Sequence, residues 1–392
     1  MKVNKWTNGL AAAGVVSLAS VAQAGEANET VMTAVSSTTL SGYVSTSAIW
    51  DPGSQAAGIP GVPFHLGGGG LANDGFNLDV VSLSISKPLD EGEWSAGYNA
   101  QLWFGDGTLG VAPAVTDDTQ IKNANVTVRV PVGNGLDVKM GIFDTIIGYE
   151  SSDYNANPNY TRNYGWFLSP VTHEGLLLSY NVTDSVSVSA GVAESNGGTL
   201  GGTASGFPGL ADTQKTWMAA VAITAPDSLG FLSGSTLYAG VVDGSWGATA
   251  DTTHLYVGST IATPVEGLTA GISWDYRFNN GPAAGFGTVA TSGAWATALA
   301  GYLSYAVTEK VGVNYRVDWG QGTDGTFGDG VVLGNLTQDK LISNTLTVDY
   351  KAWENVISRA EVRWDHSLDG VQRYGNSDRN DLSLILNLVY QF

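Results

Sequence analysis

The sequence predicts an all-β protein, a transmembrane antiparallel β-barrel of about sixteen strands. Three observations lead to this fold class. Charged residues make up only 14% of the chain, whereas about 25% of an ordinary soluble domain is charged. No apolar run after residue 24 approaches the roughly 18 residues that a membrane helix needs. Segments of alternating apolar and polar residues recur instead, and in lipid only helices and closed barrels pair all of their backbone groups.

The first 24 residues have the features of a secretory signal peptide. Lys2 and Lys5 form a positive amino-terminal region, residues 10–21 are apolar, and Ala22-Gln23-Ala24 is a small-residue cleavage motif. The apolar stretch is too short to cross a membrane as a helix. We therefore expect cleavage near Ala24 and a single barrel domain over residues 25–392.

The alternation is clearest at the carboxyl end of the chain. One face of the last predicted strand is apolar and consists of Leu382, Leu384, Leu386, Leu388, Tyr390 and Phe392. The opposite face is polar and consists of Asp381, Ser383, Asn387 and Gln391. In a membrane barrel the first face meets lipid and the second meets the lumen. Ile385 and Val389 interrupt the polar face without changing the period.

The same rule predicts sixteen strands. They lie near residues 38–50, 76–87, 93–104, 121–130, 136–147, 172–181, 185–194, 214–224, 235–243, 252–263, 268–278, 294–307, 311–320, 341–351, 355–366 and 381–392. Most connections alternate between short turns and long loops rich in Gly, Asp, Asn and Ser, which predicts short periplasmic turns and long extracellular loops. The connection at 225–234 is longer than this pattern requires, so the count is open by two strands.

Composition excludes several classes of partner. The chain has 17 Lys+Arg against 36 Asp+Glu, a net charge of −19, so it has too few cations to neutralise nucleic-acid phosphates. It contains no cysteine, which excludes disulfides and thiol chemistry. None of the four histidines, His65, His173, His254 and His366, has a partner at metal-ligand spacing. We expect no cofactor and no metal.

Signals for catalysis are weak. Residues 105–110 match G-x-G-x-x-G, but no helical pattern follows, so a glycine-rich loop is the simpler interpretation. A serine and a histidine that meet only in space would escape detection in the sequence. We expect that the chain is not an enzyme, and we keep a barrel lipid hydrolase as a rival.

Six cations fall on the polar phase of the predicted strands. Because an ionic group that faces hydrocarbon is costly, this phase must face water or buried partners. Two interpretations fit: a wall held together by salt bridges, or a lumen whose field orients solutes. The predicted pore wall comprises Arg129, Lys139, Arg277, Arg316, Arg359 and Arg363.

The loop at 148–171 is the best candidate for narrowing the channel. It follows Asp144 and holds Glu150, Asp153 and Arg162 among several aromatic residues. A long loop with many aromatic residues is expected to pack against something. Folded inward, this predicted constriction loop would set acidic groups opposite the basic wall.

Three segments of the chain carry a resemblance to a known family. The run from Gly141 to Glu150 (GIFDTIIGYE), the segment Asn157 to Tyr164 (NPNYTRNY) and the segment Pro170 to Gly175 (PVTHEG) resemble the OmpL-like family of outer-membrane β-barrel porins. The final strand, with Tyr390 and Phe392, also resembles the carboxyl-terminal signal that the barrel-assembly machinery recognises. Both resemblances imply an outer-membrane pore.

The resulting expectation is a porin for passive diffusion of small hydrophilic solutes or ions, because a barrel of sixteen to eighteen strands leaves an aqueous channel. The expected partners are outer-membrane lipid, lipopolysaccharide and the assembly machinery, and a homotrimer is compatible with this fold. A non-conducting structural or adhesive barrel is a rival, with cation-binding acidic loops such as Asp324 to Gly330. A soluble β-sandwich is another. The acidic net charge favours cations and the arginine wall favours anions, so selectivity stays open.

Overall fold

The structure is a computed structural model that describes residues 38–52, 75–105, 119–194, 215–246, 250–279, 293–323, 339–372, 374 and 378–392. The predicted signal peptide at residues 1–24 lies outside the described residues. So do His65, most of the G-x-G-x-x-G match and the acidic loop Asp324 to Gly330.

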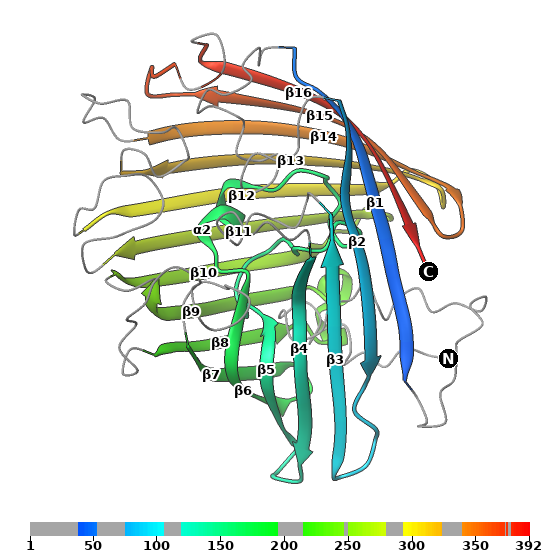
Figure 1. Ribbon diagram of the computed structural model, residues 1–392, viewed down its shortest axis with the longest axis vertical. Coiled ribbons are helices and arrows are strands. Elements are labelled where there is room, and N and C mark those ends of the chain that lie inside the picture. Colours follow the sequence, from blue (N-terminus) through cyan, green and yellow to red (C-terminus); the bar gives the residue numbers. More distant parts are fainter. Residues whose placement is uncertain are drawn as a thin grey trace.

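Sixteen antiparallel strands form a closed barrel within the described part of the chain. Each strand pairs with its sequence neighbours, and β1 pairs with β16 to close the ring (Figure 1). The strands are β1 (Thr39–Trp50), β2 (Gly75–Lys87), β3 (Ser95–Phe104), β4 (Thr119–Val130), β5 (Leu136–Asp144), β6 (Thr172–Thr183), β7 (Val186–Ala193), β8 (Thr216–Thr224), β9 (Thr236–Trp246), β10 (Ala250–Ala262), β11 (Leu268–Asn279), β12 (Trp295–Ala306), β13 (Val311–Gly322), β14 (Asp339–Trp353), β15 (Val356–Ser367) and β16 (Asn380–Gln391).

The predicted number of sixteen strands is confirmed. The long connection after β8 contains a short 3-10 helix, η3 (Asp227–Leu232), which accounts for its extra length without adding a strand. The strand predicted at 136–147 is shorter, because β5 ends at Asp144. Residues 145–147 instead begin the segment that enters the barrel. No helix among the described residues is long and apolar enough to cross a membrane.

The two faces of each strand differ in the way that alternation requires. In β16, Leu386, Leu388 and Tyr390 are exposed on the outside, whereas Ser383 and Asn387 are buried inside. Strand β15 repeats this arrangement, with exposed apolar residues between buried Arg359, Glu361, Arg363 and Asp365. The inner face of the barrel at these two strands is therefore mostly polar and charged.

Barrel closure brings the end of the chain onto β1. The amide of Phe392 donates to the Gly42 carbonyl at 3.0 Å, and the Gly42 amide donates to the Phe392 carbonyl at 2.9 Å. A Cβ atom on Gly42 would lie 2.2 Å from the Ser82 carbonyl oxygen and 2.7 Å from the Phe392 ring. Only glycine fits at this seam, since those distances are far below van der Waals contact.

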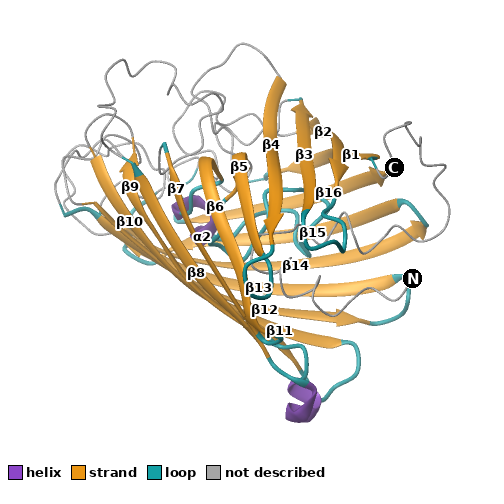
Figure 2. Cartoon of the chain, turned by 90° about the horizontal axis from the view of Figure 1, so that it is seen from below, coloured by secondary structure: helices purple, strands orange, loops and turns teal. Residues whose placement is uncertain are grey.

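The connection between β5 and β6, residues 145–171, lies inside the barrel and is called the inner loop below. It includes a short helix, α2 (Tyr164–Leu168), which contacts β11, β12 and β13 (Figures 1 and 2). The Asn163 side chain caps this helix by accepting from the Trp166 amide at 2.6 Å, a common way to satisfy a helix N-terminus. The core of the molecule therefore lies between the inner loop and the barrel wall.

Candidate functional site: the inner loop and the lumen wall

The inner loop enters the lumen through an apolar contact. Ile146 and Ile147 are buried in a cluster that includes Met218, Val242 and Tyr256 on the inner face of β8–β10. The next residue that points inward, Tyr149, stacks on Tyr302 of β12 with ring centroids 4.3 Å apart. These contacts hold the start of the loop along the inner face of β8–β12.

The loop then lies on a wall whose charges are ordered by strand register. Pairing of β13, β14 and β15 aligns Arg316, Thr345 and Arg363 in one cross-strand row. The rows on either side hold acidic groups: Asp318 and Asp365 in one, Glu361 in the other. Rows on one face are two residues, about 7 Å, apart along a strand, so an arginine side chain reaches its neighbours. These residues, with Asp349 and Arg359 one row further, are called the charged wall.

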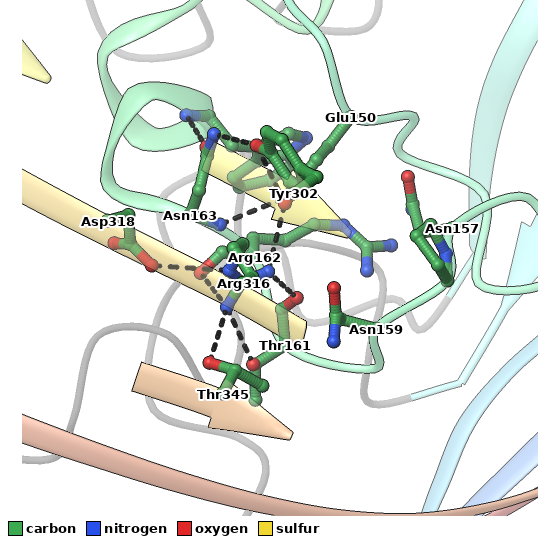
Figure 3. A network of polar contacts seen from close by, with 12 residues as sticks. Glu150, Asn157, Asn159, Thr161, Arg162, Asn163, Tyr302, Arg316, Asp318 and Thr345 are labelled. Carbon is green, nitrogen blue, oxygen red and sulfur yellow. Dashed lines mark hydrogen bonds and ion pairs between the residues drawn. The ribbon is translucent and has the colours of Figure 1, made fainter. Parts of the chain in front are cut away.

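Arg316 is the centre of the contact between the charged wall and the inner loop (Figure 3). Its side chain is fully buried. It donates to Glu150 at 2.9 Å, to the Thr161 carbonyl at 2.6 Å and to the Thr161 hydroxyl at 3.0 Å. Further bonds reach the Arg162 carbonyl, Thr345 and Asp318 at 3.1–3.2 Å. Every side of the guanidinium is thus occupied by the protein itself.

Arg363 and Arg359 are satisfied in the same way. Arg363 forms a bidentate pair with Asp365 at 2.7 and 2.8 Å and donates to the Arg162 carbonyl at 2.5 Å. Arg359 donates to the Tyr154 and Asn157 carbonyls at 2.7 and 2.8 Å. Bidentate carboxylate pairs and charge-assisted bonds to carbonyls are the stronger protein hydrogen bonds. Backbone carbonyls of the inner loop therefore accept many of the hydrogen bonds that these two arginines donate.

Glu361 provides the complementary acceptor. Its carboxylate accepts from the Tyr160 amide at 2.6 Å, from the Thr161 amide at 3.0 Å and from the Thr161 hydroxyl at 2.6 Å. Thr161 thus contacts both the basic row and an acidic row of the charged wall. Its position fixes the loop against β13–β15.

The second half of the contact lies across the barrel seam. The Tyr160 hydroxyl donates to Asp79 of β2 at 2.8 Å, and Asp79 also accepts from Ser45 and Ser47 of β1, both at 2.7 Å. Tyr160 packs there with Ile385 and Val389 of β16. The two apolar residues that interrupt the polar face of β16 are therefore explained, since they contact aromatic side chains of the inner loop.

The residues of the predicted constriction loop lie in different surroundings. Asp144 is the last residue of β5 and pairs with Lys122. Glu150 pairs with Arg316. Arg162 is buried and donates to the Tyr160 and Ser152 carbonyls of its own loop at 2.8 and 3.1 Å. Glu150 thus lies against the predicted basic wall, whereas Asp144 and Arg162 have partners elsewhere.

Asp153 is buried against β1 and β3. Its Oδ1 atom accepts from the Tyr43 hydroxyl at 3.0 Å and from the Gln101 amide at 2.9 Å. Burial raises the pKa of the Asp153 carboxyl, and the charge of Lys122 opposes this shift. This carboxyl therefore anchors the loop instead of facing open solvent.

The predicted pore-wall cations fall into two groups. Arg277, Arg316, Arg359 and Arg363 are buried. Arg129 and Lys139, on β4 and β5, are only half-buried, and Arg129 pairs with Asp137 through a 2.7 Å contact. Tyr390 and Phe392 are exposed on the outer surface near the carboxyl end. The burial of the larger group could not be read from strand phase, because it depends on the loop that covers it.

Several residues of this contact carry no signal in the sequence. Thr161 and Asn163 gave no individual signal, and Asp79 lies near an irregularity in the β1–β2 pairing where alternation is uncertain. Each of the three described histidines forms a side-chain hydrogen bond of 2.9–3.1 Å. His173 bonds to Thr145, His254 to Asp275 and His366 to Asn380. No group of three or more potential metal ligands occurs among the residues that the structure describes.

Comparison with solved structures shows the same fold in outer-membrane channels. OmpT of Vibrio cholerae in its trimer form is 13% identical, with a TM-score of 0.57 over 91% of this chain and 99% of that chain. An anion-selective porin from Comamonas acidovorans is 12% identical, with a TM-score of 0.56 over 91% and 99%. OmpF of Salmonella typhi in complex with daunomycin is 10% identical, with a TM-score of 0.58 over 91% and 97%.

A search among curated proteins gives no sequence match. A family model does match, over residues 37–392, and its description is "Putative beta-barrel porin-2, OmpL-like". That range includes all sixteen strands and the inner loop. The chain therefore belongs to the OmpL-like family of β-barrel porins, and it is a porin of the bacterial outer membrane.

Proposed function

We propose that this porin is a passive channel for small hydrophilic solutes, with no enzymatic activity, and that the inner loop narrows its lumen. The observation that carries the proposal is the fixed position of a 27-residue segment, 145–171, across a closed sixteen-stranded barrel. Barrels of this size leave an aqueous interior when nothing fills them. A loop held by a buried ion pair and by charge-assisted hydrogen bonds sets how much of that interior stays open.

The remaining expectations complete the proposal. We infer that the signal peptide is cleaved near Ala24, that residues 25–392 form one barrel domain, and that the short turns face the periplasm. A homotrimer is supported by the trimer form of OmpT of Vibrio cholerae. Three tryptophan side chains are exposed at strand ends. Trp94 and Trp353 lie near the short turns, and Trp50 lies at the end of β1 that is away from these turns. Their positions support aromatic girdles at the two membrane interfaces, where amphipathic rings are favoured.

The test is single-channel conductance of the refolded full chain in a planar bilayer, with folding checked by the mobility shift of a β-barrel on heating. Stable ohmic steps are expected. A folded barrel without conductance would contradict the proposal and favour the rival function, a structural or adhesive barrel closed by its inner loop. That rival has one observation in its support, since the loop contacts strands on several sides of the lumen.

A further inference from the structure

The charged wall has few hydrogen-bond donors or exposed charges available to a passing ion. The guanidinium groups of Arg316, Arg359 and Arg363 are bonded to carboxylates and to carbonyls of the inner loop, and all three residues are at most 5% exposed. A cation whose hydrogen-bond donors are already used, and which is shielded from water, cannot exchange hydration for contact with a solute. The charges on this side of the lumen therefore hold the inner loop and act little on a passing solute.

A different wall remains in contact with solvent. On the inner face of β1–β4, cross-strand register joins Ser86, Asn99 and Asn125 in one row and Ser41 with Ser84 in the next. Thr127 follows Asn125 on the same face of β4. All six side chains are half-buried, in contrast to the charged wall. Ser84 donates to Asn99 at 3.2 Å and the Asn125 amide donates to the Ile142 carbonyl at 2.8 Å, but a hydroxyl or an amide has further donor and acceptor capacity beyond one such bond. These six residues are called the hydroxyl–amide wall.

The charges beside this wall come in opposite signs. Arg129 donates to both carboxylate oxygens of Asp137, at 2.7 and 2.8 Å. Lys139 is directly opposite Thr127 in the β4–β5 register, on the same strand as Asp137 and Asp144. With Lys122, which pairs with Asp144, three cations and two carboxylates lie beside the wall. The local net charge is therefore small, although the whole chain carries −19.

We propose that solutes pass along the hydroxyl–amide wall, and that the channel favours uncharged hydroxylated solutes, such as monosaccharides and polyols, over ions of the same size. This inference rests on the proposed channel function. Serine and threonine hydroxyls and asparagine amides both donate and accept, so they replace the hydration of a sugar hydroxyl with matching hydrogen bonds. They supply no counter-charge for an ion that loses part of its water.

The test compares three probes of nearly equal size: glucose, glucosamine and gluconate. Swelling of vesicles that contain the refolded full chain is expected to be fastest in glucose, and a KCl gradient is expected to give a reversal potential near zero. A unit charge 4 Å from a passing ion changes its local occupancy about fivefold even in water. Asn125→Asp raises the occupancy of K⁺ and lowers that of Cl⁻ by this factor, so it should raise the permeability ratio of K⁺ to Cl⁻ about 25-fold. Asn125→Lys should shift the ratio as far in the opposite direction.

Asn134→Asp is the matched control, because it adds the same charge on an exposed turn away from the wall. It is expected to leave the ratio unchanged. Strong ion selectivity in the wild-type channel, with no response to either Asn125 variant, would overturn the inference and leave the channel function intact. A heat-modifiable, folded barrel with neither conductance nor swelling would overturn both.

Discussion

Replacement of Arg316 by methionine tests whether the charged wall holds the inner loop. Methionine keeps much of the side-chain length and removes the guanidinium. Arg316 has no exposed side-chain surface, and the Glu150 side chain that it contacts is 3% exposed. The variant would therefore leave Glu150 and Asp318 as buried carboxylates that have lost a counter-ion.

The size of the effect follows from that burial. Loss of one partner from a buried ion pair costs about 3–5 kcal/mol, chiefly because the remaining charge stays buried. The lost bonds to Thr161, Thr345 and the Arg162 carbonyl belong to the same network, so their costs do not simply add. We expect Arg316→Met to lower the free energy of unfolding by about 3–5 kcal/mol.

The assay is reversible urea unfolding in lipid vesicles, followed by tryptophan fluorescence. Arg129→Met is the control, because Arg129 also faces the lumen but its side chain is 29% exposed. Such a partly screened pair is worth about 0–1 kcal/mol. Equal losses in the two variants would refute the argument that burial, and not charge alone, makes the Arg316 contact strong. The Arg316 variant should also show noisier open-channel current, since the loop loses its central anchor.

Three further predictions concern the loop and the seam. Thr161→Val keeps the shape of the side chain but removes the hydroxyl that bridges Arg316 and Glu361, so urea unfolding should show a loss of about 1–3 kcal/mol, whereas Thr46→Val on the exposed outer face should be nearly neutral. Burial raises the pKa of the Asp153 carboxyl, so the folded state binds this proton more tightly than the unfolded state does. The free energy of unfolding therefore falls as pH rises from the unfolded pKa, about 3.9, through the folded pKa. Asp153→Asn keeps an Oδ1 acceptor for Tyr43 and Gln101, and its stability relative to wild type should therefore increase over that pH window; a constant difference would contradict the assignment. Gly42→Val should prevent closure of β1 onto β16 and abolish the heat-dependent mobility shift, while Gly301→Ala, whose new Cβ meets only Val317 at 3.6 Å, should fold.

Alternation was sufficient to predict most of the barrel. A strand with one face in lipid and one face inside must alternate with period two, so strands such as β11 and β15 were predicted within one or two residues of their observed bounds. The alternation with period two is interrupted where a β-bulge makes two successive side chains point to the same side of the sheet. In β4 both Lys122 and Asn123 are buried next to the irregular pairing between Gln101 and Leu102, and no local pattern announces that shift.

The position of the inner loop could not be predicted in the same way. Its contacts join residues that are far apart along the chain, such as Arg316 and Thr161, which are 155 positions apart. The sequence indicated only that a long aromatic loop must pack somewhere. Its strand-like start, Ile146 and Ile147, looks like a continuation of β5 because burial inside a barrel and burial within a strand select the same residue types.

An inward-facing arginine on a barrel strand therefore has two physical meanings that strand phase alone cannot separate. If water covers it, the arginine orients ions; if the chain covers it, the arginine holds that chain in place. Arg316 and Arg129 occupy the same phase of their strands, yet one is fully buried by the loop and the other is not. The covering segment decides between the two roles, because it supplies the carbonyls and carboxylates that replace water. Charge counts along the strands of such barrels thus predict ion selectivity only after the buried, internally paired arginines have been set aside.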